Sequence, residues 1–125
     1  MTCAVVGDSI AQGVAPHFVE CSALTKIGIG SLAILHRVST GYSVVVVSAG
    51  TNDWSNPHLL ANLRAIRARA ATKVIWILPV NDIARKAVQQ AAADNRDPMV
   101  AFAPGRDHVH PRSYSDLAKA IRSVL

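Results

Sequence analysis

Four consecutive valines, Val44 to Val47, constrain the fold of this chain more than any other feature. A continuous β-branched run without polar alternation is typical of a strand covered on both faces, which indicates a central strand of a parallel sheet. Shorter apolar runs predict further strands at residues 2–6, 24–27, 73–78 and 99–102. Helical spacing or helix-start signals follow each predicted strand. In the helix after residues 73–78, the inner face, which is expected to pack against the core, is made of Ile83, Ala87, Val88 and Ala91.

A strand followed by a helix, five times over, predicts an α/β fold with a parallel sheet and right-handed crossovers. For 125 residues we expect a single domain over residues 1–125, a flavodoxin-like three-layer α/β/α sandwich with strand order 2-1-3-4-5. The carboxyl ends of strands one, two, three and five then share one edge of the sheet. Polar turns that are scattered along the sequence should therefore meet at that edge.

The composition narrows the class of protein. Half of the residues are hydrophobic and 17% are charged, which favours a packed core over disorder. No apolar run reaches the roughly 18 residues of a membrane span, so no membrane partner is expected. The first four residues show no signal peptide, which makes the cytoplasm the default compartment. The net charge of +5 favours anionic partners in general, but basic blocks interleaved with aromatic residues are missing, so no nucleic acid is expected.

Two cysteines, Cys3 and Cys21, are too few for a zinc site. Two buried free thiols are the default interpretation for a cytosolic protein. Both cysteines would lie near the amino-terminal ends of the first two strands. A disulfide is therefore the alternative, if those strands are neighbours.

A candidate nucleophile follows the first strand. The apolar run Val5-Val6 stops at Gly7 and leaves Asp8 and Ser9 at its end. A buried strand that delivers a hydroxyl to the carboxyl edge of a sheet is a common way to build a reactive site. Serine is a poor nucleophile at neutral pH, so it needs a base, an acid that orients the base, and donors for an oxyanion.

The best candidate for the base is His110, which lies three residues after Asp107 in the loop before the last helix. An acid at this spacing in a turn can bring its carboxylate to the imidazole Nδ1 and leave Nε2 free to face the serine. His108 is the rival base, but adjacent residues in an extended loop point to opposite sides, so Asp107 would orient it poorly. The remaining histidines are interpreted as surface or packing residues: His17, His36 and His58.

Three donors could stabilise an oxyanion. The Ser9 N–H lies at the start of a helix, and a glycine N–H after the second strand can be approached closely because glycine has no side chain. The Asn52 side-chain amide is the third donor.

Three motifs together resemble a known family: Gly7-Asp8-Ser9-Ile10, Gly50-Thr51-Asn52-Asp53 and Asp107-His108-Val109-His110. They are similar to the motifs of the SGNH hydrolases, also called the GDSL esterase/lipase family. Each motif alone is weak, but the three occur in the family's order at the ends of predicted strands. The resemblance implies that Ser9 is nucleophile and oxyanion donor, Asn52 a further donor, His110 the base and Asp107 its partner. For the glycine donor after the second strand, the resemblance favours Gly28 over Gly30. Gly28 lies seven residues before Leu35, and this spacing is similar to that in the second sequence block of the family.

Some features depart from the family or argue against other classes. Ile10 replaces the usual leucine of the first motif, and the short chain suggests an open, shallow site. An α/β-hydrolase elbow is disfavoured because Ala11 stands where its second glycine would be. Asp107, His108 and His110 could bind a metal adventitiously, but no functional metal and no cofactor are expected.

The sequence therefore predicts a carboxylic-ester hydrolase that works through an acyl-enzyme. Its expected substrate is a small-molecule or glycan ester, with O-acetyl groups on carbohydrate or cell-wall glycan favoured. The alternative is a non-catalytic, carbohydrate-binding member of the same fold.

Overall fold

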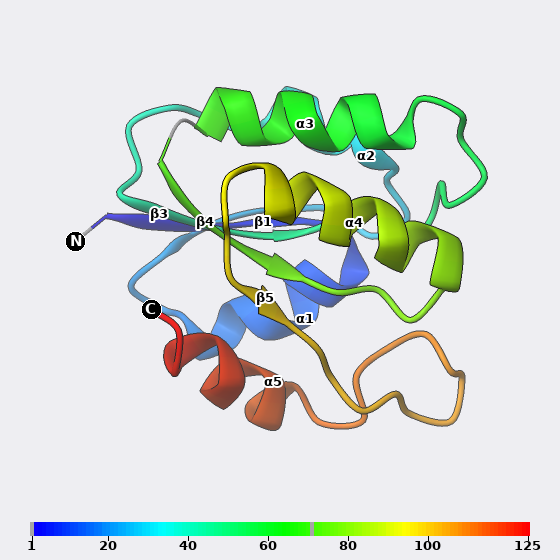
Figure 1. Ribbon diagram of the computed structural model, residues 1–125. Helices are drawn as coiled ribbons and strands as arrows, with labels where there is room; N and C mark the ends of the chain where they lie inside the picture. Colours follow the sequence, from blue (N-terminus) through cyan, green and yellow to red (C-terminus); the bar gives the residue numbers. More distant parts are fainter. Residues whose placement is uncertain (1, 71) are drawn as a thin grey trace.

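The computed structural model describes residues 2–70 and 72–125 and contains a five-stranded parallel sheet in the order β2-β1-β3-β4-β5 (Figure 1). The predicted fold class and strand order are confirmed. The strands are β1 (Cys3–Gly7), β2 (Ser22–Thr25), β3 (Val44–Ser48), β4 (Lys73–Ile77) and β5 (Met99–Val100). The valine run forms β3 at the centre of the sheet, and every residue of this strand is buried.

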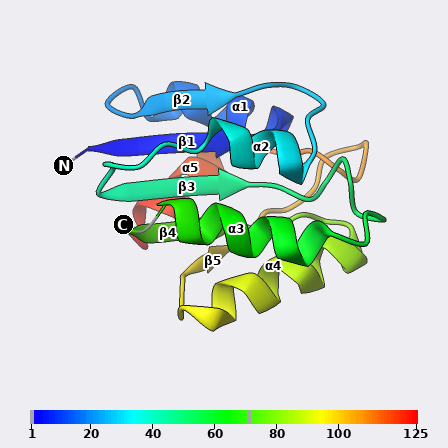
Figure 2. The ribbon, with the colours of Figure 1, turned by 90° about the horizontal axis from the view of Figure 1, so that it is seen from above.

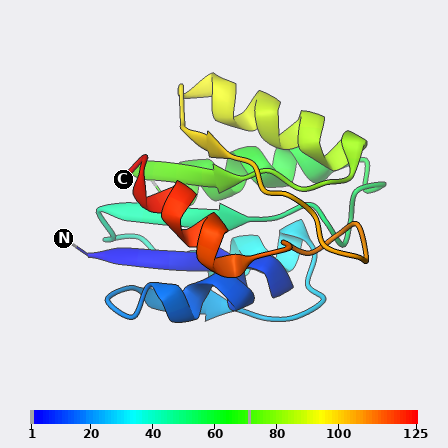
Figure 3. The ribbon, with the colours of Figure 1, turned by 90° about the horizontal axis from the view of Figure 1, so that it is seen from below.

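Helices cover both faces of the sheet. One face carries α2 (Ser31–Arg37), α3 (Leu59–Ala70) and α4 (Asp82–Asp94), which Figure 2 shows from above. The other carries α1 (Ser9–Val14) and α5 (Tyr114–Arg122), which Figure 3 shows from below, and α1 continues into the 3-10 helix η1 (Ala15–His17). Alternate residues of β3 enter the two cores, with Val45 and Val47 on one side and Val44 and Val46 on the other. The sheet is therefore buried on both faces, as the unbroken apolar run predicts.

Several element boundaries differ from the predictions. The second strand spans Ser22–Thr25 and not residues 24–27, and the fifth stops at Val100. The predicted inner face of α4 was wrong at Ile83, which is 57% exposed. The buried positions are Ala84, Val88, Ala91 and Ala92. The stripe that faces the sheet is thus rotated by one residue and is rich in alanine, so hydrophobicity alone did not locate it.

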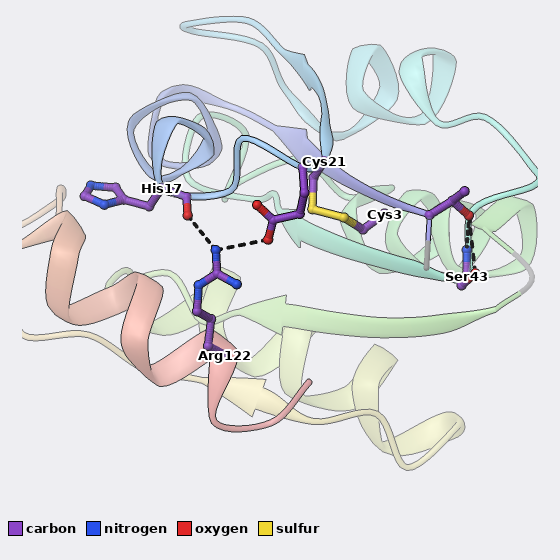
Figure 4. Close-up of a disulfide and its surroundings, with 7 residues drawn as sticks. Cys3, His17, Cys21, Ser43 and Arg122 are labelled. Atoms are coloured by element: carbon purple, nitrogen blue, oxygen red, sulfur yellow. Dashed lines mark hydrogen bonds and ion pairs between the residues drawn. A yellow bond between two sulfur atoms is a disulfide. The ribbon is translucent and has the colours of Figure 1, made fainter.

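Cys3 and Cys21 form a disulfide, so the interpretation as free thiols was wrong (Figure 4). The bond ties β1 to the segment that leads into β2. Arg122 of α5 holds the same segment, because its guanidinium donates to the His17 carbonyl (2.8 Å) and pairs with Glu20 (3.0 Å). Within residues 2–70 and 72–125, no helix has the length and apolar character needed to cross a membrane.

Candidate active site

Ser9 is the first residue of α1. Just before it, at Gly7, the backbone passes very close to the end of β3. Gly7 has a φ of +143°, and a Cβ added there would lie 2.0 Å from the Ser48 carbonyl oxygen at the end of β3. Only glycine fits such an approach. Asp8 then caps α1, because its Oδ1 accepts the Ile10 N–H at 3.1 Å. This turn places the Ser9 hydroxyl at the carboxyl edge of the sheet.

Residues 103–112, in the connection between β5 and α5, are held as a closed turn and are called the 103–112 loop below. Its two legs are joined by hydrogen bonds from the Gly105 N–H to the His110 carbonyl and from the Arg112 N–H to the Ala103 carbonyl, both at 2.8 Å. At its tip, Asp107 Oδ1 accepts the backbone N–H groups of Val109 (3.0 Å) and His110 (2.9 Å). The acid and the histidine are therefore fixed relative to each other by their own backbone.

The structure brings the three predicted triad residues together. The Ser9 Oγ lies 2.8 Å from His110 Nε2, and His110 Nδ1 lies 2.6 Å from Asp107 Oδ2. His110, and not its rival His108, makes this contact. His108 has a φ of +58° and takes part in the turn of the loop. The other histidines, His17, His36 and His58, are exposed, in agreement with their interpretation as surface residues.

The charge on Asp107 assigns the direction of both hydrogen bonds. The hydrogen bond from the His110 imidazole, and then those from the backbone N–H groups of His110 and Val109, hold the pKa of Asp107 well below its usual range. Asp107 is thus an ionised, acceptor-only partner at neutral pH. His110 Nδ1 must carry the proton that it donates to Asp107, so in the neutral imidazole Nε2 accepts the Ser9 hydroxyl proton.

The loop after β3 is tied to the loop after β2. The Asn52 Nδ2 donates to the Ile29 carbonyl at 3.0 Å, and this nitrogen carries a second hydrogen. Asp53 Oδ2 accepts the Ser31 N–H at 3.0 Å and also the Ser31 hydroxyl. Asn52 is therefore held against the segment that contains both candidate glycines.

The two glycines have different surroundings. Gly28 has a φ of +81°, and a Cβ added there would meet nothing within 4 Å. A Cβ at Gly30 would lie 3.1 Å from the Asp53 Cγ. Gly28 is thus favoured by its backbone conformation, whereas Gly30 packs closely against the Asp53 side chain, in the loop of Asn52.

Two titratable groups close to the candidate site were missed by the sequence analysis. Asp8 is fully buried, and its Oδ1 also accepts the Ser48 hydroxyl at 2.8 Å. Its Oδ2 has no hydrogen-bond partner among the described residues, and burial raises the pKa of Asp8 to about 6. Tyr114, the first residue of α5, packs against Gly13 of α1. Burial, followed by the charges of Asp8 and Asp107, raises the pKa of Tyr114.

The triad is open to solvent, since the side chains of His110 and Asp107 are 40% and 52% exposed. Two hollows lie next to the 103–112 loop: one of about 480 Å³ beside the start of α5, and one of about 560 Å³ that is lined by residues of both legs of the loop. Across residues 2–70 and 72–125, no group of three or more His, Cys, Asp or Glu residues is placed to hold a metal ion.

Comparisons of the chain with protein-family models, with curated proteins and with solved structures give no match. The residues and their geometry alone therefore carry any conclusion about function.

Proposed function

We propose that this protein is a serine esterase of the SGNH type that hydrolyses esters of small acyl groups. The observation that carries the proposal is the chain of two hydrogen bonds from Ser9 Oγ through His110 to Asp107, at 2.8 and 2.6 Å. A nucleophile, a base and an orienting acid in this order form the arrangement required for acyl transfer.

In the proposed reaction, the Ser9 Oγ attacks the ester carbonyl carbon while its proton passes to His110 Nε2. The resulting imidazolium is stabilised by the Asp107 carboxylate. The tetrahedral intermediate then collapses, and the leaving alcohol takes the proton from Nε2. Water repeats the cycle on the acyl-enzyme: its proton goes to Nε2, its oxygen joins the acyl carbon, and Ser9 leaves with the proton.

The oxyanion of each intermediate needs donors that are in place beforehand. We assign this role to the Ser9 N–H, the free hydrogen of the Asn52 amide and the Gly28 N–H. Gly30 is the alternative to Gly28. Both glycines belong to the segment that Asn52 contacts through the Ile29 carbonyl.

The favoured substrate is an O-acetyl group on carbohydrate or cell-wall glycan. A small acyl group suits a triad that is exposed at the edge of the sheet. The second candidate, a carbohydrate-binding protein without turnover, would keep this edge but show no dependence on Ser9.

Hydrolysis of nitrophenyl acetate, together with intact mass after a fluorophosphonate probe, tests the proposal. We expect wild type to turn over the ester and to gain one probe adduct that maps to Ser9. Ser9→Ala should lose both, whereas Ser115→Ala, which removes an exposed hydroxyl from α5, should keep both. Equal rates in wild type and Ser9→Ala would falsify the proposal.

The assignment of the base is tested within the same loop. Removal of one triad member from a serine hydrolase costs on the order of 10⁴-fold or more in kcat. We expect a loss of this size in His110→Gln and only a small change in His108→Gln, because His108 does not contact the nucleophile. The reverse order would reassign the base.

The glycine donor is tested by Gly28→Ala and Gly30→Ala. Loss of one oxyanion donor lowers kcat by about 10²- to 10³-fold. A Cβ on the donor glycine obstructs the approach of the substrate oxygen, so we expect the larger loss in kcat for Gly28→Ala. Thermal unfolding of both variants separates this effect from lost stability. A larger loss for Gly30→Ala at equal stability would transfer the role to Gly30.

A further inference from the structure

A second contact joins the two segments that carry Ser9 and His110. Tyr114, the first residue of α5, packs the far end of its side chain against Gly13 of α1. Gly13 lies four residues after Ser9, and Tyr114 lies four residues after His110. Figure 3 shows the start of α5 beside α1. The Ser9–His110 hydrogen bond of 2.8 Å and the Gly13–Tyr114 contact are therefore two links between the same pair of segments.

Ser9 and Gly13 share one side of α1. Residues four apart in a helix are neighbours on its surface, and both of these residues are partly exposed. The other side of α1 is anchored in the core by side chains that are fully buried: Ile10, Ala11 and Val14. The helix has only 6 residues, so a contact at Gly13 acts on the same short unit that carries Ser9.

The glycine at position 13 is explained by space and not by its backbone conformation. Gly13 lies inside α1 and its φ is not positive, and at such a position alanine is the more favourable residue. A Cβ added there would lie 2.7 Å from the Tyr114 hydroxyl oxygen and closer still to two carbons of the ring. The missing side chain thus leaves the room that the tyrosine ring occupies.

The Tyr114 ring has surroundings that hold it in place. It is partly buried and packs against the core cluster that contains Val14 of α1 and Leu117 of α5. Burial, followed by the charges of Asp8 and Asp107, raises the pKa of Tyr114, so its hydroxyl is neutral at neutral pH. The side chain therefore acts as an uncharged, packed spacer between α1 and the segment that follows His110.

We propose that Tyr114 is a positioning residue, whose ring, packed against Gly13, fixes the distance between the Ser9 hydroxyl and the His110 imidazole. The inference rests on the proposed function and adds a residue to it. Ser9 and His110 come from distant parts of the chain, so their alignment depends on how α1 packs against the start of α5. A misplacement of about 1 Å in an active site can lower the rate by about 10²-fold.

Gly13→Ala tests the spacing from the side of α1. The added methyl group displaces the ring, so we expect kcat for nitrophenyl acetate to fall by about 10²-fold with KM unchanged. Labelling of Ser9 by the fluorophosphonate probe should slow by a similar factor. Thermal unfolding checks that the variant is folded at the assay temperature.

Variants of Tyr114 test the spacing from the side of α5. Tyr114→Ala removes the ring and should lower kcat as Gly13→Ala does, whereas Tyr114→Phe keeps the ring and should keep the kcat of wild type. The double variant Gly13→Ala, Tyr114→Ala should lose about 10²-fold, because both changes remove one contact, whereas independent effects would multiply to about 10⁴-fold.

Ile121→Val is the matched control for lost packing. Ile121 is fully buried in the same core cluster and lies about two turns beyond Tyr114 in α5. The loss of one buried methyl group should lower the unfolding temperature and leave kcat unchanged.

Nitrogen NMR of the imidazole reports the Ser9–His110 hydrogen bond without turnover. The His110 resonances are assigned by their loss in His110→Gln. We expect the Nε2 resonance to move in Ser9→Ala, where the hydrogen bond is missing. It should move in the same direction in Gly13→Ala and Tyr114→Ala and stay in place in Tyr114→Phe and Ile121→Val.

Unchanged kcat and unmoved His110 resonances in Gly13→Ala and Tyr114→Ala would overturn the inference. Equal losses in Tyr114→Phe and Tyr114→Ala, or in Ile121→Val and Tyr114→Ala, would overturn it too, because the hydroxyl or general stability would then explain the effect. The two proposals fail separately. Ser9-dependent hydrolysis that neither variant lowers rejects only the positioning role, and moved resonances without Ser9-dependent hydrolysis reject only the esterase.

Discussion

At the scale of single residues, the site depends on how closely β1 approaches the end of β3. A Cβ at Gly7 would meet the Ser48 carbonyl oxygen at 2.0 Å, and φ is +143°. We expect Gly7→Ala to lower the free energy of unfolding by about 3 kcal/mol or more, because overpacking and backbone strain add. Gly41→Ala is the control, because Gly41 also has a positive φ of +97° but a Cβ added there would meet nothing within 4 Å. We expect this variant to lose about 1 kcal/mol. Urea unfolding measures both, and equal losses would contradict the role of the close approach.

The buried carboxylate of Asp8 should make stability depend on pH. Burial raises the pKa of Asp8 from 3.8 to about 6, so between these values the folded protein binds a proton that the unfolded chain does not. The free energy of unfolding therefore falls as pH rises through this window, by about 3 kcal/mol in total. Asp8→Asn should remove this slope and be more stable than wild type at pH 7. Urea unfolding of both proteins between pH 4 and pH 7 checks this, and parallel curves would contradict it.

The residues of the proposed triad could be predicted because their relation is partly local. Asp107 and His110 share one turn, and Ser9 follows a strand whose end the fold class places at the same edge. The partners of Asp8 and Asp53 could not be predicted in this way. Ser48 and Ser31 are ordinary serines in the sequence, and they matter only because packing brings them to the carboxylates of the buried Asp8 and the partly buried Asp53.

At the scale of elements, hydrophobic pattern predicted which segments are strands and helices better than which face is buried. The valine run identified the central strand because both of its faces are covered. In α4 the inner face is rich in alanine, so Ile83 was a misleading guide to the core.

The cap of α5 should couple helix stability to the site. The Ser113 hydroxyl accepts the Asp116 N–H at 3.1 Å, directly after the 103–112 loop. Asn81 caps α4 in the same way through the Ala84 N–H at 3.0 Å. We expect Ser113→Ala and Asn81→Ala each to lose about 1 kcal/mol in urea unfolding. Only Ser113→Ala should also lower esterase kcat, because it loosens the leg that carries His110. Similar kcat values in the two variants would show that the loop is rigid without the cap.

At the scale of the whole molecule, the order of the strands in the sheet does most to bring the site residues together. The alternation of strands and helices along the sequence was enough to predict this strand order. The disulfide depended on a finer feature, the register of β1 against β2. Ala4 pairs with Ser22, so Cys3 lies opposite Cys21 with the Cα atoms 4.7 Å apart. The predicted second strand began two residues too late, which is enough to hide this pairing.

The disulfide closes a loop that contains all of α1 and Ser9. Its cysteines are 18 residues apart, and a cross-link of this span stabilises a protein by about 3 kcal/mol, mainly by restricting the unfolded chain. We expect reductant to lower the unfolding temperature of wild type by roughly 10 °C. The double variant Cys3→Ser, Cys21→Ser should unfold at the lower temperature with or without reductant. Because Arg122 also holds the segment before β2, the fold of the reduced protein should persist at 25 °C, with its Ser9 still open to the fluorophosphonate probe. An unfolding temperature that reductant does not change would show that the bond contributes no stability.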